Sequence, residues 1–436
     1  MTDATVSQSG EMTAEEAVRV DRLRAGLKRR YAREKRFKLY GLLAIGVAVG
    51  FLLLLLGRIV EQGHTAFYAH TMTVPVYMDP ARIDRAYPQG TNFELLVAEQ
   101  QLARLGVQDD AQGTKATAMR GLFSSELKFI AAGRLQRQPG LLGQTVPIAA
   151  PLSDDADLYF KGEISRDTPA DQRRLSDEQI GWLDRMQADG QVASRFNSAL
   201  FTKGDSTEPE LAGVLGAVIG SALMLLVTAV IAIPLGVGAA LYLEEFAPRG
   251  RLTNLIEVNI NNLAAVPSII YGLLGLALFI NWMHLPRASP LVGGLVLALM
   301  ALPTIIIATR SSLKAVPPSI REAALAMGAS KTQTVFQHTL PLAMPGVMTG
   351  AIISMAHALG ETAPLLLIGM VSFVPGVPHA LTEAGGALPS LVYIWENASE
   401  RAFHERTAAA ILVLLAFMIV MNAAAIFLRR RFERRW

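Results

Sequence analysis

The chain has 436 residues, a formal net charge of +3, 51% hydrophobic residues and a mean hydropathy of +0.34. This composition indicates a membrane protein with a soluble part rather than a soluble enzyme. The chain contains no cysteine, which excludes a disulfide, a thiolate nucleophile and a metal site built on cysteine.

The first hydrophobic segment lies within residues 39–61 and predicts a transmembrane helix. A cleaved signal peptide is the alternative, but the apolar core of about 18 residues is too long for one, and no A-x-A-like cleavage site follows it. The segment before it, residues 1–38, is expected to be a cytoplasmic tail because basic residues flank the span on that side. This position favours a membrane-flanking role over nucleic-acid binding for these residues: Lys28, Arg29, Arg30, Arg33, Lys35, Arg36 and Lys38.

Residues 62–210 are long enough to form a soluble domain, which we expect on the periplasmic side. The stretch MTVPVYM predicts a short extended segment, and NFELLVAEQQLARLG, AMRGLFSSELKFIAAGRL and LSDEQIGWLDRMQ have helical spacing. Ser176 and Gln179 match a capping box. The acidic run DDAD at 154–157 favours a solvated loop over a calcium site. The domain is therefore predicted to be mixed α/β, without a metal.

The second half of the chain, residues 211–428, is predicted to contain five further spans. Pro234 lies in the first of them, and Gly360 and Pro364 lie in the fourth, so these two helices are expected to kink or break. A basic cytoplasmic tail, 429–436, follows. The predicted fold is an all-α polytopic membrane protein of about six transmembrane helices, whose five further spans are 211–243, 255–280, 291–308, 344–374 and 408–428.

The distribution of basic residues predicts the orientation. Six spans return the C-terminus to the side of the N-terminus, so both termini are expected in the cytoplasm. The short loop after 291–308 carries four basic residues and falls on the same side: Arg310, Lys314, Arg321 and Lys331.

The sequence lacks several motifs that would supply chemistry. There is no G-x-x-x-x-G-K-[ST] loop for nucleotide phosphates and no G-x-S-x-G nucleophile elbow. His404-Glu405 begins a zinc motif, but position 408 is alanine. We therefore predict a protein that is not an enzyme and carries no cofactor.

The polar stretch 319–341 separates two apolar spans. Ser319 to Glu322 fits S-x-x-E, a capping box that would begin a helix ending near Gly328. Ser330 is predicted to cap a second short helix, which Pro341 would stop. By its residues alone this helix-turn-helix fits either an interfacial hairpin covering the bundle or a docking surface for a partner.

The same stretch resembles the EAA loop of ABC-importer permeases. The family pattern is Glu-Ala-Ala, three residues, Gly, nine residues, a branched apolar residue, one more residue and Leu-Pro. His338 departs from it, since isoleucine is usual there. The resemblance implies that the loop docks on an ATP-hydrolysing subunit. The coupling residues would be Arg321, Glu322, Ala323, Ala324, Gly328, Leu340 and Pro341.

Three further segments resemble the A-type permease subunit of the phosphate-specific ABC importer: YLEEFAPRGRLTNLIEV, NINNLAAVPSIIYGLLGLALF and HALGETAPLLLIG. The likeness covers about residues 211–436, and 62–210 resembles an extension in one branch of that family. It implies an ABC-importer permease fold forming half of a phosphate pathway in the membrane lipid. The implied partners are a second homologous permease, two copies of an ABC ATPase and a periplasmic phosphate-binding protein.

A candidate substrate pathway centres on Glu361, because an ionisable residue inside a span is costly and functional by default. His357, four residues earlier, is expected to pair with it, where relatives commonly carry arginine. Gly360, Thr362 and Arg310 complete the candidate set. The alternatives are a structural polar pair for His357 and Glu361, and snorkelling to lipid headgroups for Arg310.

Three other functions remain open. Another oxyanion is the nearest alternative substrate. A membrane sensor or scaffold built on the 62–210 domain is the second alternative. A self-sufficient secondary transporter is the third, but the sequence shows no inverted repeat and little intramembrane charge.

Overall fold

A computed structural model describes residues 14–85, 87–169, 173–371 and 373–432. The chain divides into two units, residues 1–59 and 60–436. In the first unit, one helix, α1 (Ala14–Gly63), includes the predicted first span and runs into the start of the second unit. The helix contains no proline, which is consistent with its continuity from the charged first half into the apolar second half. Residues 1–13 and 433–436, which belong to the two predicted tails, lie outside the described residues.

The second unit begins with a small antiparallel sheet of strand order β2-β1-β3. The strands are β1 (Tyr68–Tyr77), β2 (Thr145–Pro151) and β3 (Val192–Phe196), with Val74 opposite Ile148 and His70 opposite Ser194. Alternate side chains of β1 are buried, as expected for a sheet with one covered face. The predicted extended segment is confirmed as β1, whereas β2 and β3 were not predicted because both are short.

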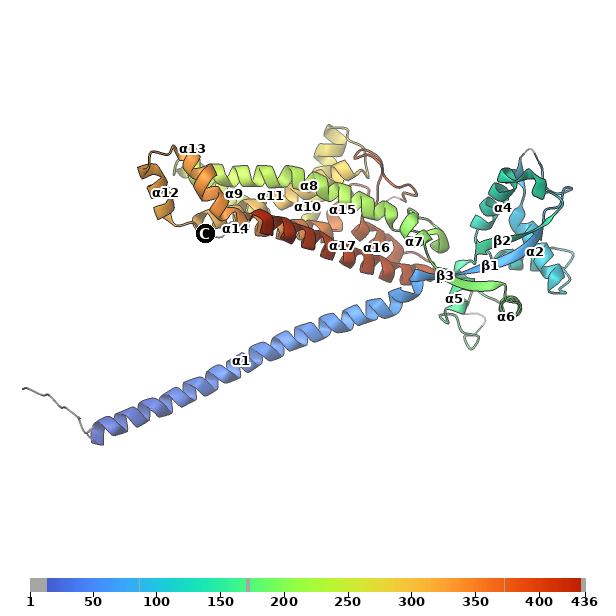
Figure 1. The fold of residues 1–436 in the computed structure, drawn as a ribbon, viewed down its shortest axis with the longest axis horizontal. Helices are drawn as coiled ribbons and strands as arrows, with labels where there is room; N and C mark the ends of the chain where they lie inside the picture. Colours follow the sequence, from blue (N-terminus) through green and yellow to red (C-terminus); the bar gives the residue numbers. More distant parts are fainter. Residues whose placement is uncertain (1–13, 86, 170–172, 372, 433–436) are drawn as a thin grey trace, which may run out of the picture. The chain divides into compact units, whose positions relative to one another are not determined.

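Helices cover this sheet and complete the mixed α/β insert (Figure 1). Two of the three predicted helical stretches are confirmed, and the third is divided at Gly121 into two helices. The capping box of Ser176 and Gln179 is confirmed. The helices are α2 (Phe93–Arg104), α3 (Thr114–Arg120), α4 (Glu126–Arg137), α5 (Asp154–Phe160) and α6 (Asp177–Ala188), with short 3-10 turns at His64–Phe67, Pro88–Gly90 and Pro139–Leu141.

The acidic run 154–157 is not a loop, because it forms the first turn of α5. Acidic side chains are favourable at a helix N-terminus, which explains this placement. Asp157 is buried and accepts hydrogen bonds from the backbone N–H of His70. Within the described ranges, no group of three or more His, Asp or Glu side chains is arranged to hold a metal ion.

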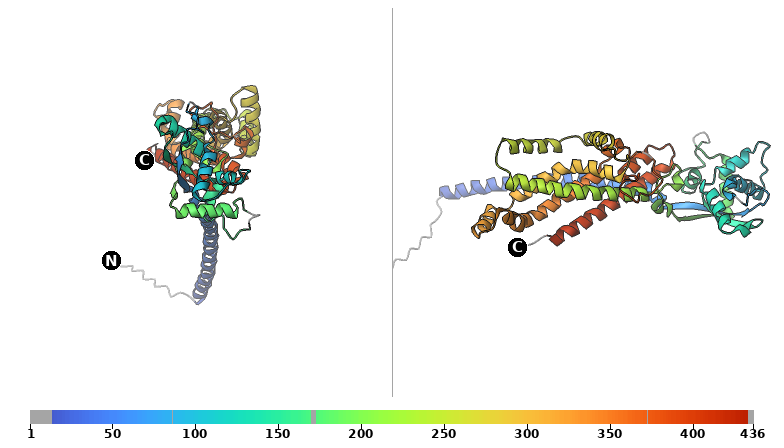
Figure 2. Two further views of the ribbon diagram at one scale, coloured as in Figure 1. Left: turned by 90° about the vertical axis from the view of Figure 1, so that its right-hand side faces the viewer. Right: turned by 90° about the horizontal axis from the view of Figure 1, so that it is seen from above.

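Five helices of the described chain are long and apolar enough to cross a membrane, or six if one bent pair forms a single span. In the second unit, α8, α11, α14 and α17 form an elongated bundle (Figures 1 and 2). Its elements are α7 (Ala199–Thr202), a 3-10 turn (Pro209–Leu211), α8 (Leu215–Leu241), α9 (Arg251–Ala264), α10 (Ser268–Gly275), α11 (Pro290–Lys314), α12 (Pro318–Ala326), α13 (Lys331–Gln333), α14 (Leu340–Gly360), α15 (Ala363–Leu367), α16 (Leu388–Glu396) and α17 (Ala402–Phe432).

The bundle is tight where small residues meet. A Cβ on Gly350 would lie 2.2 Å from the Cβ of Ala308, so a larger residue would separate α14 from α11. The hydroxyl of Thr228 on α8 donates to the carbonyl of Gly294 on α11, at 3.1 Å.

Two predicted spans are broken. The segment 255–280 is not one straight helix, since α9 and α10 meet at 101° across Ala265–Pro267, and Pro267 disfavours helical backbone in the residue before it. The segment 344–374 ends as a helix at Gly360, and Glu361 is extended. Pro234, in contrast, lies inside an unbroken α8.

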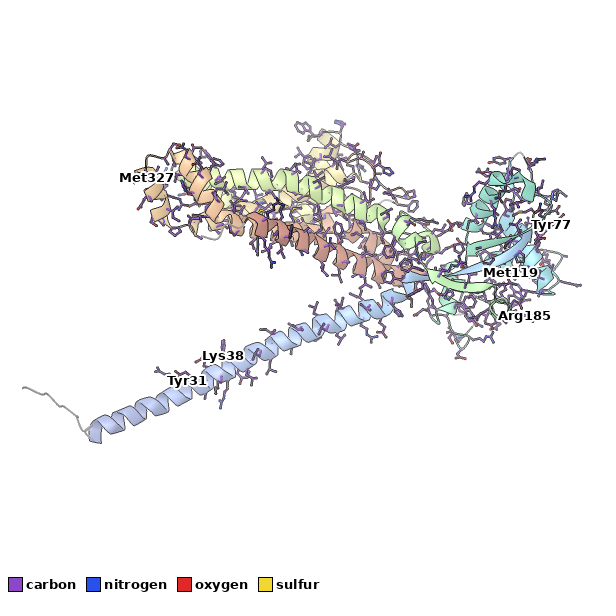
Figure 3. The ribbon with its side chains drawn as sticks, in the orientation of Figure 1. Tyr31, Lys38, Tyr77, Met119, Arg185 and Met327 are labelled. Atoms are coloured by element: carbon purple, nitrogen blue, oxygen red, sulfur yellow. The ribbon has the colours of Figure 1, made fainter. Side chains whose placement is uncertain are left out.

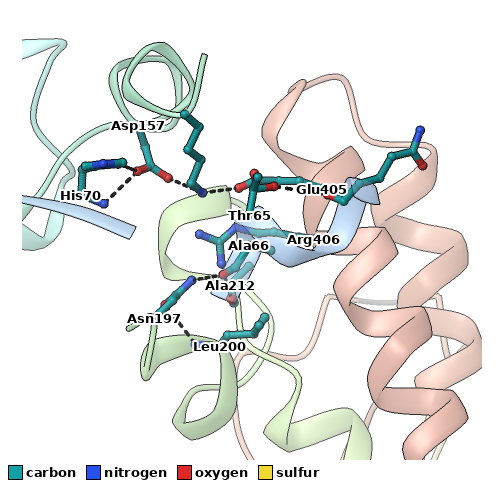
Figure 4. Close-up of polar contacts among 11 residues, drawn as sticks. Thr65, Ala66, His70, Asp157, Asn197, Leu200, Ala212, Glu405 and Arg406 are labelled. Atoms are coloured by element: carbon teal, nitrogen blue, oxygen red, sulfur yellow. Dashed lines mark hydrogen bonds and ion pairs between the residues drawn. The ribbon is translucent and has the colours of Figure 1, made fainter. Parts of the chain in front are cut away.

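The insert packs against one end of the bundle through an apolar cluster that includes Ala66, Leu200, Trp395 and Phe403. Buried polar contacts add to it (Figure 4). The ammonium of Lys161 on α5 lies 2.7 Å from Asp157 and 2.6 Å from Glu405 on α17. The insert is therefore joined to α17 by apolar packing and by an ion pair.

Candidate functional site

The helix that carries the predicted coupling residues is α12, and it begins differently from the prediction. Its N-cap is Pro317 and Pro318 is its first residue, so Ser319 already lies within the first turn. No side chain caps this helix, and the predicted capping box of Ser319 and Glu322 is wrong. The reason is that proline at the first helical position fixes a suitable φ and lacks the N–H that a cap would satisfy.

The end of α12 agrees with the prediction. Gly328 has φ +86°, a conformation that glycine adopts without strain. Its N–H donates to the carbonyl of Leu325, and the N–H of Ala329 donates to that of Ala324. This pair of bonds is a Schellman motif, which satisfies the last carbonyls of the helix.

The second predicted helix is not separate. Ser330 caps it, with Gln333 completing a capping box, as expected. However, Pro341 does not stop it, because Lys331–Gly360 forms one continuous helical segment. A π-helical turn, Thr334–Thr339, ends two residues before the proline. Such a turn rearranges the hydrogen-bond ladder where proline removes a donor, so the helix continues.

The outer surface of this segment is open. Glu322 and Ala323 are exposed, as are Leu325, Phe336 and, at 87%, Met327. Figure 3 shows Met327 at the end of the bundle that is formed by α12 and α13. Exposed apolar side chains beside a glutamate form a surface suited to a protein partner. Of the remaining predicted coupling residues, Ala324, Leu340 and Pro341 are half-buried. His338, which departs from the family pattern, is exposed.

Arg321 points into the protein rather than toward a partner. Its Nη2 lies 2.7 Å from Oε1 of Glu245, and the same guanidinium donates to the carbonyls of Leu313 and Val316, each at 2.8 Å. Sequence reasoning missed Glu245. The adjacent glutamates 244 and 245 at the end of an apolar span were the signal that was available.

Arg310 is also paired within the chain. Its Nη2 lies 2.5 Å from Oε1 of Glu257 on α9, and its Nε lies 3.3 Å from Glu244 at the end of α8. Two carboxylates therefore hold the side chain of Arg310 within the chain. Both carboxylates also offset the positive charge that an anion would need.

His357 and Glu361 form the predicted pair, with Nε2 and Oε1 3.2 Å apart. The His357 side chain is 68% exposed, whereas Glu361 is 21% exposed. Gly360 is the last residue of α14, and Thr362 is the N-cap of α15. The structure thus brings His357 and Glu361 together, but no contact joins them to Arg310 in the described part of the chain.

Asn259 of α9 makes its hydrogen bond within its own helix and not to a neighbouring helix. Its amide donates 2.8 Å to the carbonyl of Leu255 in its own helix. No residue of α9 is buried, so this helix presents both polar and apolar side chains outside the packed bundle.

A bundle of membrane-length helices with an exposed helix-turn element at one end defines the class of a polytopic membrane protein. Residues 232–436 match the family model of the binding-protein-dependent transport system inner membrane component. The chain belongs to this family. Residues 24–170 match a domain of unknown function, DUF3333.

Curated relatives match the second half of the chain. One is the phosphate transport system permease protein PstA 1 of Mycobacterium tuberculosis (strain ATCC 25618 / H37Rv), 34% identical over 218 residues, which are 50% of this chain and 70% of the relative. Another is the probable ABC transporter permease protein YqgI of Bacillus subtilis (strain 168), 31% identical over 49% of this chain and 76% of the relative. Among solved structures, the inward-facing MetNI methionine ABC transporter matches with a TM-score of 0.40 and 21% identity, over 51% of this chain and 95% of that chain.

Proposed function

We propose that this chain is a permease subunit of an ATP-driven phosphate importer. The observation that carries the proposal is the exposed surface of α12 and its turn, at the position where the sequence resembles a coupling loop. Relatives at 30–34% identity whose names include phosphate transport support the substrate. The chain itself performs no chemistry: a separate ABC ATPase, in two copies, hydrolyses ATP, and a second homologous permease completes the pathway.

The proposed topology places the coupling end in the cytoplasm. The ion pairs of Arg310 with Glu257 and of Arg321 with Glu245 lie at that end, and residues 1–38 and 429–436 share this side of the inner membrane. The 62–210 domain then lies in the periplasm, between the 39–61 helix and the 211–428 transmembrane domain. A phosphate-binding protein would deliver its ligand on this side.

In the proposed pathway, phosphate passes near Glu361. A bare carboxylate repels an anion, and His357 at 3.2 Å reduces this repulsion when it is protonated. Arg310 is less suited to anion contact because Glu244 and Glu257 already hold it.

The test is reconstitution of the four-component complex in liposomes, with ATP inside and phosphate and its binding protein outside. We expect ATP-dependent phosphate uptake and phosphate-stimulated ATP hydrolysis. Glu361→Gln is expected to lower uptake about tenfold, with exposed Glu383→Gln as a control of unchanged rate. Uptake of another oxyanion in place of phosphate, or uptake without the ATPase, would contradict the proposal.

A further inference from the structure

The coupling helix α12 is held by few contacts. None of its residues, Pro318–Ala326, is buried. Ile320 is half-buried and packs at the edge of an apolar cluster that includes Leu313 and Val335. Apolar packing alone therefore fixes this helix weakly, because the hydrophobic contribution follows the apolar area removed from water.

The guanidinium of Arg321 holds α12 in place by hydrogen bonds and an ion pair where apolar packing is weak. It donates to two carbonyls at the C-terminal end of α11 and, through Nε and Nη2, to the carboxylate of Glu245. A planar guanidinium that contacts one carboxylate with two nitrogens fixes direction as well as distance. One side chain of α12 is thus tied both to α11 and to the end of α8.

Glu245 lies in the π-helical turn that ends α8, Tyr242–Phe246. The N–H of Ala247 donates to the carbonyl of Tyr242 at 2.7 Å and closes this turn. The Glu245 side chain is 8% exposed, so its carboxylate has little access to water. Single π turns interrupt the regular helix and direct side chains away from its usual spacing.

The neighbouring carboxylate of the same turn contacts different partners. Glu244 lies 3.3 Å from Arg310 of α11, and Arg310 lies 2.5 Å from Glu257 of α9. Successive residues of one turn therefore join α12 on one side and α11 and α9 on the other. A displacement of α12 reaches α8 through Glu245 and reaches α9 through Glu244 and Arg310.

We propose that Arg321 and Glu245 form a positioning pair that makes α12 move together with the cytoplasmic end of α8, so that ATPase motion reaches the transmembrane helices. Arg321 acts inside the chain, and the partner contacts fall to the exposed residues Glu322, Ala323, Leu325 and Met327. This inference rests on the proposed importer function.

The experiment measures phosphate transported per ATP hydrolysed in the reconstituted four-component complex. The variants are Glu245→Gln, Arg321→Gln and the double variant. The control is Lys314→Gln, whose ammonium is 58% exposed and 3.6 Å from Glu244. We expect the single variants to retain the ATPase on co-purification and to lower phosphate per ATP about fivefold or more. The double variant should be no worse than either single one, because both remove the same contact.

A second measurement separates coupling from folding. The chain has no cysteine, so Glu245→Cys with Arg321→Cys can be joined by a short bismaleimide before assembly. We expect the joined protein to recover phosphate per ATP relative to the unjoined one. Unchanged phosphate per ATP in both single variants, or no recovery on joining, would overturn the inference. Absence of ATP-dependent uptake by the unaltered complex would instead overturn the proposed function.

Discussion

At the insert end of the bundle, Lys161 is 4% exposed and lies between Asp157 and Glu405, whereas at the coupling end Arg321 is 23% exposed and pairs with Glu245. The insert end adds a buried apolar cluster, and the coupling end carries a helix without a buried residue. Charged contacts therefore stabilise two different kinds of structure in this chain. The contacts of Lys161 are enclosed in a packed interface, whereas the pair of Arg321 and Glu245 connects a helix without a buried residue to the rest of the bundle.

The largest expected effect is at the packed interface. Lys161→Met removes the ammonium from between Asp157 and Glu405, and leaves buried carboxylates without their cation. We expect a loss of about 3–5 kcal/mol of unfolding free energy, because a buried unpaired charge is strongly destabilising. Thermal unfolding of the purified chain in detergent measures it. Lys115→Met, at an exposed pair with Glu178, should cost less than about 1 kcal/mol, and equal shifts would remove the contrast.

The second prediction uses pH at the same interface. Burial raises the pKa of Glu210 from 4.5 to about 7, and Asp154 and Glu208 add to the effect. A raised carboxyl pKa stabilises the folded state below pH 4.5, and this contribution is lost as the pH rises through 7. Glu210→Gln stays neutral, so we expect it to be more stable than the unaltered chain by about 2–3 kcal/mol at alkaline pH.

The advantage of Glu210→Gln should vanish toward pH 5, which unfolding temperatures measured across the range would show. Exposed Glu178→Gln is the control and should give no such pH-dependent gain. A constant difference at every pH would mean that the substitution acts by packing and not by charge.

The third prediction concerns the surface of the coupling end. Glu322→Lys reverses an exposed charge on α12, and Glu322 forms no ion pair with another described residue, so membrane insertion and unfolding temperature should not change. Docking of the ATPase should weaken about tenfold, or about 1.4 kcal/mol. Co-purification and binding of the ATPase subunit measure this. Normal docking would show that Glu322 lies outside the interface.

The smallest effect is expected at the turn after α12. Gly328→Ala forces φ +86° on a residue with a Cβ, which costs about 1 kcal/mol. Because α12 has no buried residue, we expect faster hydrogen exchange of residues 325–330 without a lower unfolding temperature. Gly140→Ala, which has open space and no positive φ, is the matched control. A global loss of stability would indicate that α12 is more firmly packed than its exposure implies.

Sequence reasoning succeeded where the signal is local. The spans follow from runs of apolar residues, β1 from an alternating segment, and the caps at Ser176 and Ser330 from spacing of three residues. The pair of His357 and Glu361 follows from helical spacing. Each of these features depends only on residues that are close together in the sequence.

Predictions failed where the structure depends on the effect of a proline on its helix or on contacts between residues distant in the sequence. Proline favours the first helical position, so α12 begins at Pro318 and is not capped by Ser319 as predicted. A π turn allows the later helix to continue through Pro341. The sequence by itself determined the membrane class, the insert and the family pattern of the coupling segment. Only the tertiary structure decided that Arg321 faces Glu245, 76 residues away, because an ion pair between helices depends on their packing and not on their spacing in the chain.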